Sequence, residues 1–325
     1  MNDGLRSKRL RRVVALAIAA AVPVALAVGT ATAGSTAASC GKVRLNEQAW
    51  SGSTANTYVA KYVLEKKLGC KVEITKITEI PVFQAMADGR VDVVLEDWQH
   101  VDQYKQYITK AKTVVAAGPN GVKGHIGWYI PAYLLKQYPQ FKSWQGLKGK
   151  ESIFKTPESG SQGMFLGGDP SYVQKDKELI KALGLNFKHV TAGAEPAQVA
   201  RWTQLYKQKK PVIFYWYVPQ YLNAQYQLAE VKLPPRFASC KDDAKAGGNV
   251  AQYRCAYGVT IINKLMSKKF AASGSPAVAF VKRWTWTNSD QEFVAKLIAG
   301  DHMTPDKAAK KWIDAHPGKV KAWLG

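Results

Sequence analysis

Three aromatic residues stand where predicted strands end or give way to a helix, and these positions suit a binding site. Trp98 ends one apolar run and Tyr217 ends another, while Trp50 lies between a first strand and a helix start rich in glycine and hydroxyl groups. Ligands of open α/β sheets bind at the carboxyl ends of the strands. Because aromatic ring faces attract soft, permanently charged cations, these positions predict a pocket for a quaternary ammonium group.

Neighbouring residues on the same strands divide into pocket and core candidates. Side chains alternate along a strand, so Glu96 faces the same side as Trp98 and adds a carboxylate to the predicted cation site. Trp216 points to the opposite side from Tyr217 and is predicted to pack in the core. Trp128 and Tyr129 alternate in the same way, so at most one of them faces the cleft; we take Trp128 as the candidate.

The residues that catalysis would need do not form a recognisable set. The five histidines show no metal-binding spacing such as HExxH. The segment 159–163 resembles a nucleophile loop but lacks the G-x-S-x-G turn and its strand. No phosphate-binding or dinucleotide-binding loop is present either. We therefore predict a binding protein without catalytic residues, metal or cofactor, and keep a secreted enzyme as the less favoured alternative.

Residues 1–33 have the pattern of a signal peptide. A basic segment is followed by an apolar run of sixteen residues, 13–28, and then by small residues at 31–33. A membrane-spanning helix needs about 20 apolar residues, so export is the better interpretation. We expect an exported, extracytoplasmic protein.

The net charge is strongly positive but carries no nucleic-acid signature. The formal charge is +22, and the signal region holds five basic residues and one acidic residue, which leaves +18 for the mature chain. Such a charge suits nucleic acid, an anionic cell wall or a lipid surface. Because the lysines are scattered and no arginine-rich stripe occurs, we expect a solvated basic surface and no nucleic-acid partner.

Four cysteines in an exported chain indicate two disulfides. Cys40 and Cys70 each precede a predicted strand, and parallel neighbouring strands would bring them to one edge of the sheet. Cys240 and Cys255 enclose a polar loop and are expected to pair with each other. Each bridge would stabilise the fold by about 3–4 kcal/mol in the chain-entropy model. The competing interpretation is that Cys40 carries a lipid, which would leave Cys70 unpaired.

The order of predicted elements indicates an α/β fold with two lobes. Alternating strands and helices form a βαβαβ unit before residue 100, and a second α/β unit follows a composition change at 118–121. We predict a periplasmic-binding-protein-like architecture with a mostly parallel, helix-flanked sheet in each lobe and the ligand in the cleft. The predicted lobes comprise residues 34–123 with 257–325, and residues 124–256. Helix starts are expected at Ser289, in a capping box, and at Thr304-Pro305.

Five short motifs in order along the chain resemble one protein family. They are Trp50-Ser51-Gly52 with Ala55-Asn56, Leu95-Glu96-Asp97-Trp98-Gln99-His100, Ile126-Gly127-Trp128-Tyr129-Ile130-Pro131, Gly168-Asp169-Pro170-Ser171-Tyr172, and Tyr217-Val218-Pro219-Gln220-Tyr221. The chain resembles the glycine betaine, choline and proline-betaine substrate-binding proteins of ABC importers. In such proteins two lobes close over the ligand, and aromatic rings surround its trimethylammonium group.

The resemblance implies site residues and partners. It assigns cage positions to Trp98, Tyr217, Trp50 and Tyr172, although family members often have tryptophan where this chain has the two tyrosines. Groups around Ser51, Gly52 and Ser53 would hold a ligand carboxylate at the helix start.

The expected ligand is a quaternary ammonium compatible solute with a role in osmoprotection. Glycine betaine is the first candidate, and choline and proline betaine remain alternatives. The expected partner is an ABC permease in the membrane. The protein would associate with the membrane through this permease or through a lipid on Cys40. We expect a monomer, and a receptor for another amine or amino-acid-like solute is the alternative.

Overall fold

The computed structural model describes residues 40–325 except residue 246, so the predicted signal peptide lies outside the described residues. The strands are β1 Lys42–Asn46, β2 Lys71–Thr75, β3 Val93–Asp97, β4 Val114–Pro131, β5 Gly163–Gly167, β6 Phe187–Thr191, β7 Ile213–Val218, β8 Leu228–Glu230 and β9 Val259–Ser267. The helices are α1 Ser51–Leu68, α2 Pro81–Ala87, α3 Val101–Gln103, α4 Tyr133–Gln137, α5 Trp144–Leu147, α6 Asp176–Leu183, α7 Glu195–Lys207, α8 Lys268–Ala271, α9 Pro276–Arg283, α10 Asn288–Ala295, α11 Pro305–Ala315 and α12 Pro317–Leu324.

The strands join in one mixed sheet with the order β2-β1-β3-β9-β4-β7-β5-β6, and β8 pairs with β4. Strands β1, β2 and β3 are parallel at one end, and β5, β6 and β7 are parallel at the other. The antiparallel strands β4 and β9 connect these two groups. We call the β1–β3 end with its helices lobe 1 and the β5–β8 end lobe 2. The exact lobe boundaries stay a prediction.

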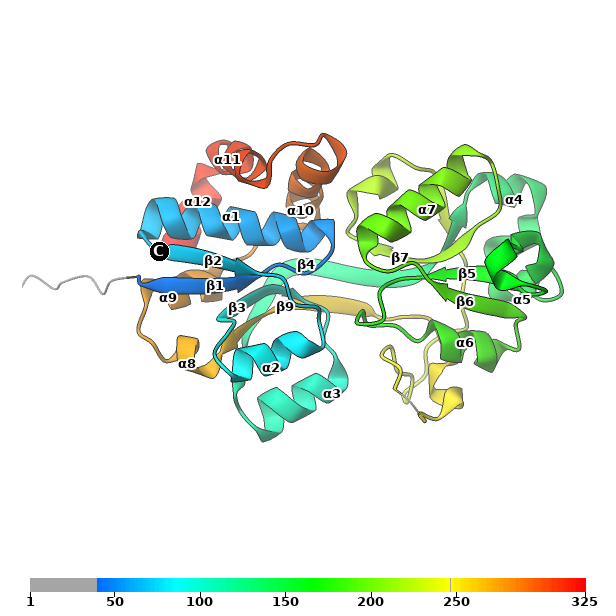
Figure 1. Ribbon diagram of the computed structural model, residues 1–325, viewed down its shortest axis with the longest axis horizontal. Coiled ribbons are helices and arrows are strands. Elements are labelled where there is room, and N and C mark those ends of the chain that lie inside the picture. Colours follow the sequence, from blue (N-terminus) through cyan, green and yellow to red (C-terminus); the bar gives the residue numbers. More distant parts are fainter. Residues whose placement is uncertain (1–39, 246) are drawn as a thin grey trace, which may run out of the picture. The chain divides into compact units, whose positions relative to one another are not determined.

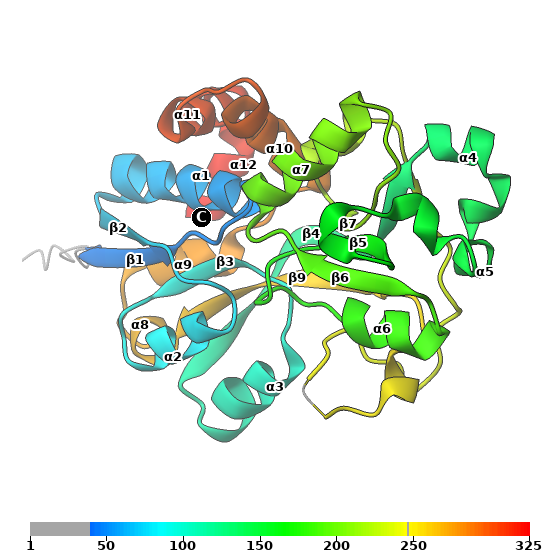
Figure 2. The ribbon, with the colours of Figure 1, turned by 45° about the vertical axis from the view of Figure 1, so that its right-hand side comes forward.

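Helices cover both faces of the sheet in each lobe. In lobe 1, α1 packs on α10 and α11 on one side, while α2 and α3 lie on the other (Figure 1). In lobe 2, α7 and α6 lie on opposite faces, as the turned view also shows (Figure 2). This arrangement explains why the central strands are apolar on both sides, because both faces of each strand are buried.

The segment 118–121, where the sequence composition changes, is part of β4. This strand continues through the segment with register irregularities between Ala116 and Lys123. Two glycines in the segment, Gly118 and Gly121, have positive φ values of 85° and 94°. A bulged strand bends without losing its neighbours, so β4 passes from lobe 1 to lobe 2 as one continuous element.

Several helix boundaries follow the local sequence signals. Helix α1 ends at Gly69, whose φ is 67° and whose N–H donates to the carbonyl of Leu64. Helix α11 begins at Pro305, as predicted, and α2 also begins at a proline, Pro81. The capping box of α10 lies two residues before the predicted position. Thr287 is the N-cap there, because its hydroxyl accepts the N–H of Asp290 and its own N–H donates to that carboxylate.

Both predicted disulfides are present, Cys40–Cys70 and Cys240–Cys255. The first joins the starts of the parallel strands β1 and β2, where Lys42 pairs with Lys71. The second closes the loop between β8 and β9. Within the described residues, no helix combines the length and apolarity that crossing a membrane requires.

Candidate ligand-binding site

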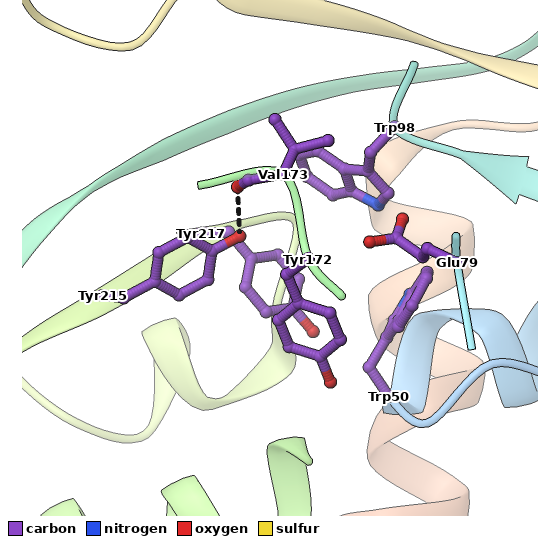
Figure 3. Close-up of a pocket in the computed structure, with 7 residues that line it drawn as sticks. All are labelled: Trp50, Glu79, Trp98, Tyr172, Val173, Tyr215 and Tyr217. Atoms are coloured by element: carbon purple, nitrogen blue, oxygen red, sulfur yellow. Dashed lines mark hydrogen bonds between the residues drawn. The ribbon is translucent and has the colours of Figure 1, made fainter. Parts of the chain in front are cut away.

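A pocket lies between the two lobes, at the ends of strands β3 and β7 (Figure 3), and the cavity inside it is about 20 Å³. A cavity of this size holds about one water molecule, so the lining side chains pack closely around the site. Its lining contains five aromatic rings, one carboxylate and one valine. The residues are Trp50, Glu79, Trp98, Tyr172, Val173, Tyr215 and Tyr217. We call the five aromatic residues the aromatic cage.

The aromatic cage is built from edge-to-face pairs that join the lobes. Trp98, directly after β3, meets Tyr217 of β7 with ring centroids 5.6 Å apart and an interplanar angle of 84°. Trp50, at the N-cap of α1, meets Tyr172 at 5.5 Å and 89°. Edge-to-face contact is a favoured geometry for pairs of aromatic rings. The structure thus brings together the four aromatic residues that the resemblance assigned to the cage.

Glu96 holds both tryptophans from behind. Its Oε1 accepts the indole N–H of Trp50 at 2.9 Å and that of Trp98 at 3.2 Å. Its Oε2 accepts from the side-chain amide of Asn56 at 2.9 Å. Glu96 is therefore a positioning residue rather than part of the pocket lining. Burial raises its pKa to about 7, although the hydrogen bonds it accepts oppose the rise.

The tyrosine hydroxyls of the cage are also directed at protein acceptors. The hydroxyl of Tyr172 donates to the carbonyl of Ala49 at 3.1 Å, and that of Tyr215 donates to the carbonyl of Val173 at 3.3 Å. The Tyr217 hydroxyl donates to the carboxylate of Glu195. Every polar hydrogen of the five cage side chains is thus engaged. What the cage presents to the pocket is ring carbon.

Two glycines make room for cage rings. A Cβ on Gly124 of β4 would lie 2.5 Å from the nearest indole carbon of Trp98. A Cβ on Gly168 would lie 2.9 Å from the ring of Tyr172. Because Cβ atoms do not tolerate contacts this short, any other residue would displace these rings.

Glu79 brings a carboxylate into the pocket and belongs to a buried charge network. Its Oε2 lies 3.4 Å from Nε2 of His100, whose Nδ1 is 2.8 Å from Asp243. Burial opposes the charged form of His100, but the hydrogen bonds and charges of Asp243 and Glu79 outweigh it and raise its pKa to about 11. His100 is therefore an imidazolium at neutral pH. Asp243 lies in the Cys240–Cys255 loop, so this network also connects the lobes.

Two groups at the start of α1 already have protein partners. The N–H of Ser51 donates to Oε1 of Glu195 at 2.9 Å, and the hydroxyl of Ser53 accepts the N–H of Gln48. Gly52 leaves space for Glu96 and Gln291, because a Cβ there would approach both side chains closely. Ser51, Gly52 and Ser53 thus support the site without lining the pocket.

Trp128 lies away from the pocket. Its ring is fully buried against Phe165 with centroids 4.8 Å apart, and its N–H donates to Asp176 at 2.7 Å. The buried Asp176 explains the position, since an indole N–H inside a core needs an acceptor. Trp216 is buried in the core of lobe 2 against Trp202, as predicted.

Sequence reasoning missed Glu79, Val173, Glu195 and the role of Tyr215. A signal existed for two of them. Tyr215 alternates with Tyr217 on the same side of β7, and Glu79 follows β2 at the same sheet edge where Trp98 follows β3. Glu195 gave no such signal, because its partner Ser51 lies 144 residues away in sequence.

The geometry suits a small cation. Ring faces and a buried carboxylate attract positive charge, and the lining side chains offer no free donor to an anion. Among the described residues, no group of three or more histidine, cysteine or acidic side chains is placed to hold a metal ion.

Known proteins share this fold. A choline-binding protein of an ABC transporter, solved with choline, superposes with a TM-score of 0.70 at 18% identity and covers 88% of this chain and 92% of its own. The lactococcal protein OpuAC, solved closed with glycine betaine, gives a TM-score of 0.68 at 20% identity over 87% of this chain and 99% of its own. These likenesses confirm the two-lobed periplasmic-binding-protein-like fold.

Sequence comparison places the chain in a family. It is 24% identical over 279 residues to the trimethylamine N-oxide-binding protein of Pelagibacter ubique (strain HTCC1062), covering 81% of this chain and 84% of the relative. Residues 41–315 match the family described as the substrate binding domain of ABC-type glycine betaine transport systems. This match confirms the expected resemblance and a binding rather than catalytic role: the chain belongs to that family of substrate-binding domains.

Proposed function

We propose that the protein is the extracytoplasmic receptor of an ABC importer and binds a small quaternary ammonium solute in the pocket of the aromatic cage. The lobes close over the ligand, and the closed form delivers it to a membrane permease. The observation that carries this proposal is the aromatic cage itself: five rings from both lobes present carbon faces, while their polar hydrogens point to protein acceptors.

This pattern fits an N-methylated ammonium group better than an amino acid. A quaternary nitrogen has no N–H donors, so it can be buried against ring faces without unpaired hydrogen bonds. A primary ammonium needs several acceptors once buried, and the pocket offers one carboxylate, Glu79. The related proteins are described as binding glycine betaine, choline or trimethylamine N-oxide, and all three ligands carry an N-methylated nitrogen.

Glycine betaine and choline are the two leading candidate ligands. The family description and the sequence motifs favour glycine betaine. One observation favours choline: the backbone donor at the start of α1, which would hold a betaine carboxylate, is already bonded to Glu195.

Calorimetric titration of the purified protein tests the proposal. The panel contains tetramethylammonium, glycine betaine, choline, trimethylamine N-oxide, glycine and proline. We expect the N-methylated compounds to bind and glycine and proline to bind at least tenfold more weakly. Tighter binding of glycine or proline than of every N-methylated compound would instead indicate a receptor for an amino-acid-like solute.

A further inference from the structure

One oxygen of Glu79 is buried at the pocket without a partner. The residue is 2% exposed and lines the pocket, and its Oε1 has no hydrogen-bond partner among the described residues. Figure 3 shows its carboxylate directed into the pocket toward the tyrosine rings. A buried acceptor without a donor is costly, so this oxygen is placed to receive a hydrogen bond from a ligand.

The other oxygen of Glu79 is held in place. It faces Nε2 of the charged His100, which Asp243 fixes from its other side. The carboxylate therefore cannot turn away from the pocket without breaking its ion pair with His100. Its free oxygen has a set direction, which is what selective recognition of a donor requires.

A second carboxylate occupies the place where a ligand's own carboxylate is expected. Glu195, 3% exposed, accepts the N–H of Ser51 at the start of α1 and also the hydroxyl of Tyr217. A helix start favours negative charge, and here the protein supplies that charge itself. A ligand carboxylate brought to this position would meet Glu195 and find the Ser51 N–H engaged.

Building on the proposed function, we propose that Glu79 and Glu195 make the pocket select an N-methylated ammonium cation that carries a hydroxyl group and no carboxylate. Choline has this chemistry. Its trimethylammonium group would lie against the cage rings and its hydroxyl would donate to Oε1 of Glu79. Glycine betaine would place its carboxylate near Glu79 or Glu195 and be repelled by either. Glu79 is then a specificity-determining ligand contact, and Glu195 is a residue that excludes anionic groups.

The test on the wild-type protein compares choline with ethyltrimethylammonium, which has almost the same shape but no hydroxyl, and with glycine betaine. A hydrogen bond to a charged acceptor corresponds to about a 10- to 100-fold gain in affinity. We therefore expect choline to bind at least tenfold more tightly than either compound. Equal affinities for choline and ethyltrimethylammonium would overturn the role of Glu79. This comparison needs no variant and so does not depend on one that folds.

Variants then assign the effect to residues. In Glu79→Leu the ratio of choline to ethyltrimethylammonium affinity should fall to about one. Asp102→Asn is the matched control, because it removes the same charge at a different place. The half-exposed carboxylate of Asp102 lines the neighbouring hollow outside Trp98. That control should keep the wild-type ratio. Glu195→Ala frees the Ser51 N–H, so glycine betaine should gain affinity relative to choline.

The outcomes separate this inference from the proposed function. If glycine betaine binds more tightly than choline in the wild-type protein, the inference is wrong and the receptor function stands. If no N-methylated compound binds, both are wrong. An unchanged ratio of betaine to choline affinity in a folded Glu195→Ala protein would contradict the part assigned to Glu195.

Discussion

Replacing Trp98 with alanine should weaken the binding of tetramethylammonium about 30-fold. The indole is buried at the pocket, and its N–H donates to Glu96, so the side chain presents ring carbon to the ligand. A desolvated cation–π contact contributes about 2 kcal/mol, and each 1.4 kcal/mol is a factor of ten in affinity. Tetramethylammonium is the right probe, because it has neither hydroxyl nor carboxylate and reports the cage alone.

The same substitution also removes a buried side chain, which typically costs about 3–5 kcal/mol of folding free energy. Affinity must therefore be measured by calorimetry well below the melting temperature, with circular dichroism confirming that the variant is folded. Trp98→Phe keeps a ring and loses the N–H bond to Glu96, so its affinity should lie between the wild type and Trp98→Ala. Trp144→Ala is the control, since this indole packs near Arg254 outside the pocket.

An unchanged affinity in a folded Trp98→Ala protein would refute the cation–π reasoning. The control must keep wild-type affinity for that conclusion to hold. A loss of equal size in Trp144→Ala would mean that the effect comes from general destabilisation rather than from the cage.

Four further predictions follow from the site and the disulfides. Affinity for tetramethylammonium should rise from pH 5.5 to pH 8, because a cation favours the ionised forms of Glu79, whose pKa burial raises, and of Glu96, whose pKa burial raises to about 7; proton release at pH 6, measured by calorimetry in two buffers, checks the sign. Gly124→Ala should weaken binding about tenfold by displacing the Trp98 ring, and calorimetry against the wild type would reveal it. Glycine betaine should bind far more tightly than glycine in one titration, and the reverse order would argue against the cage. The intact mass of the exported protein should be four hydrogens below the reduced form, whereas a diacylglyceryl mass on Cys40 would contradict its bond to Cys70.

Much of the fold could be predicted from the sequence because its signals are local. Proline at residue 81 and glycine at residue 69 set helix boundaries through their own backbone preferences, and the structure has the boundaries there. The βαβαβ order predicted parallel strands, and β1 pairs in parallel with β2 and β3. The glycines and proline of segment 118–121 do not interrupt β4, because Pro119 pairs with Asn263 of β9 there.

Trp98 and Tyr217 could be placed at the site from sequence because a strand end fixes where a side chain emerges. Trp128 could not be placed from its strand alone. Alternation says only that it faces one side of β4, and the buried acceptor Asp176 on α6 decides that this side is core.

The sequence by itself indicated a cation-binding site, since aromatic side chains gathered at strand ends attract cations. Only the tertiary structure decided which polar groups remain available to a ligand. Glu79 is close to His100 in sequence, but its free oxygen is defined by a pocket that both lobes build. Glu195 reaches Ser51 across 144 residues and occupies the donor that the sequence assigned to the ligand. Hydrogen bonds between distant segments depend on the closed fold, and no local pattern records them.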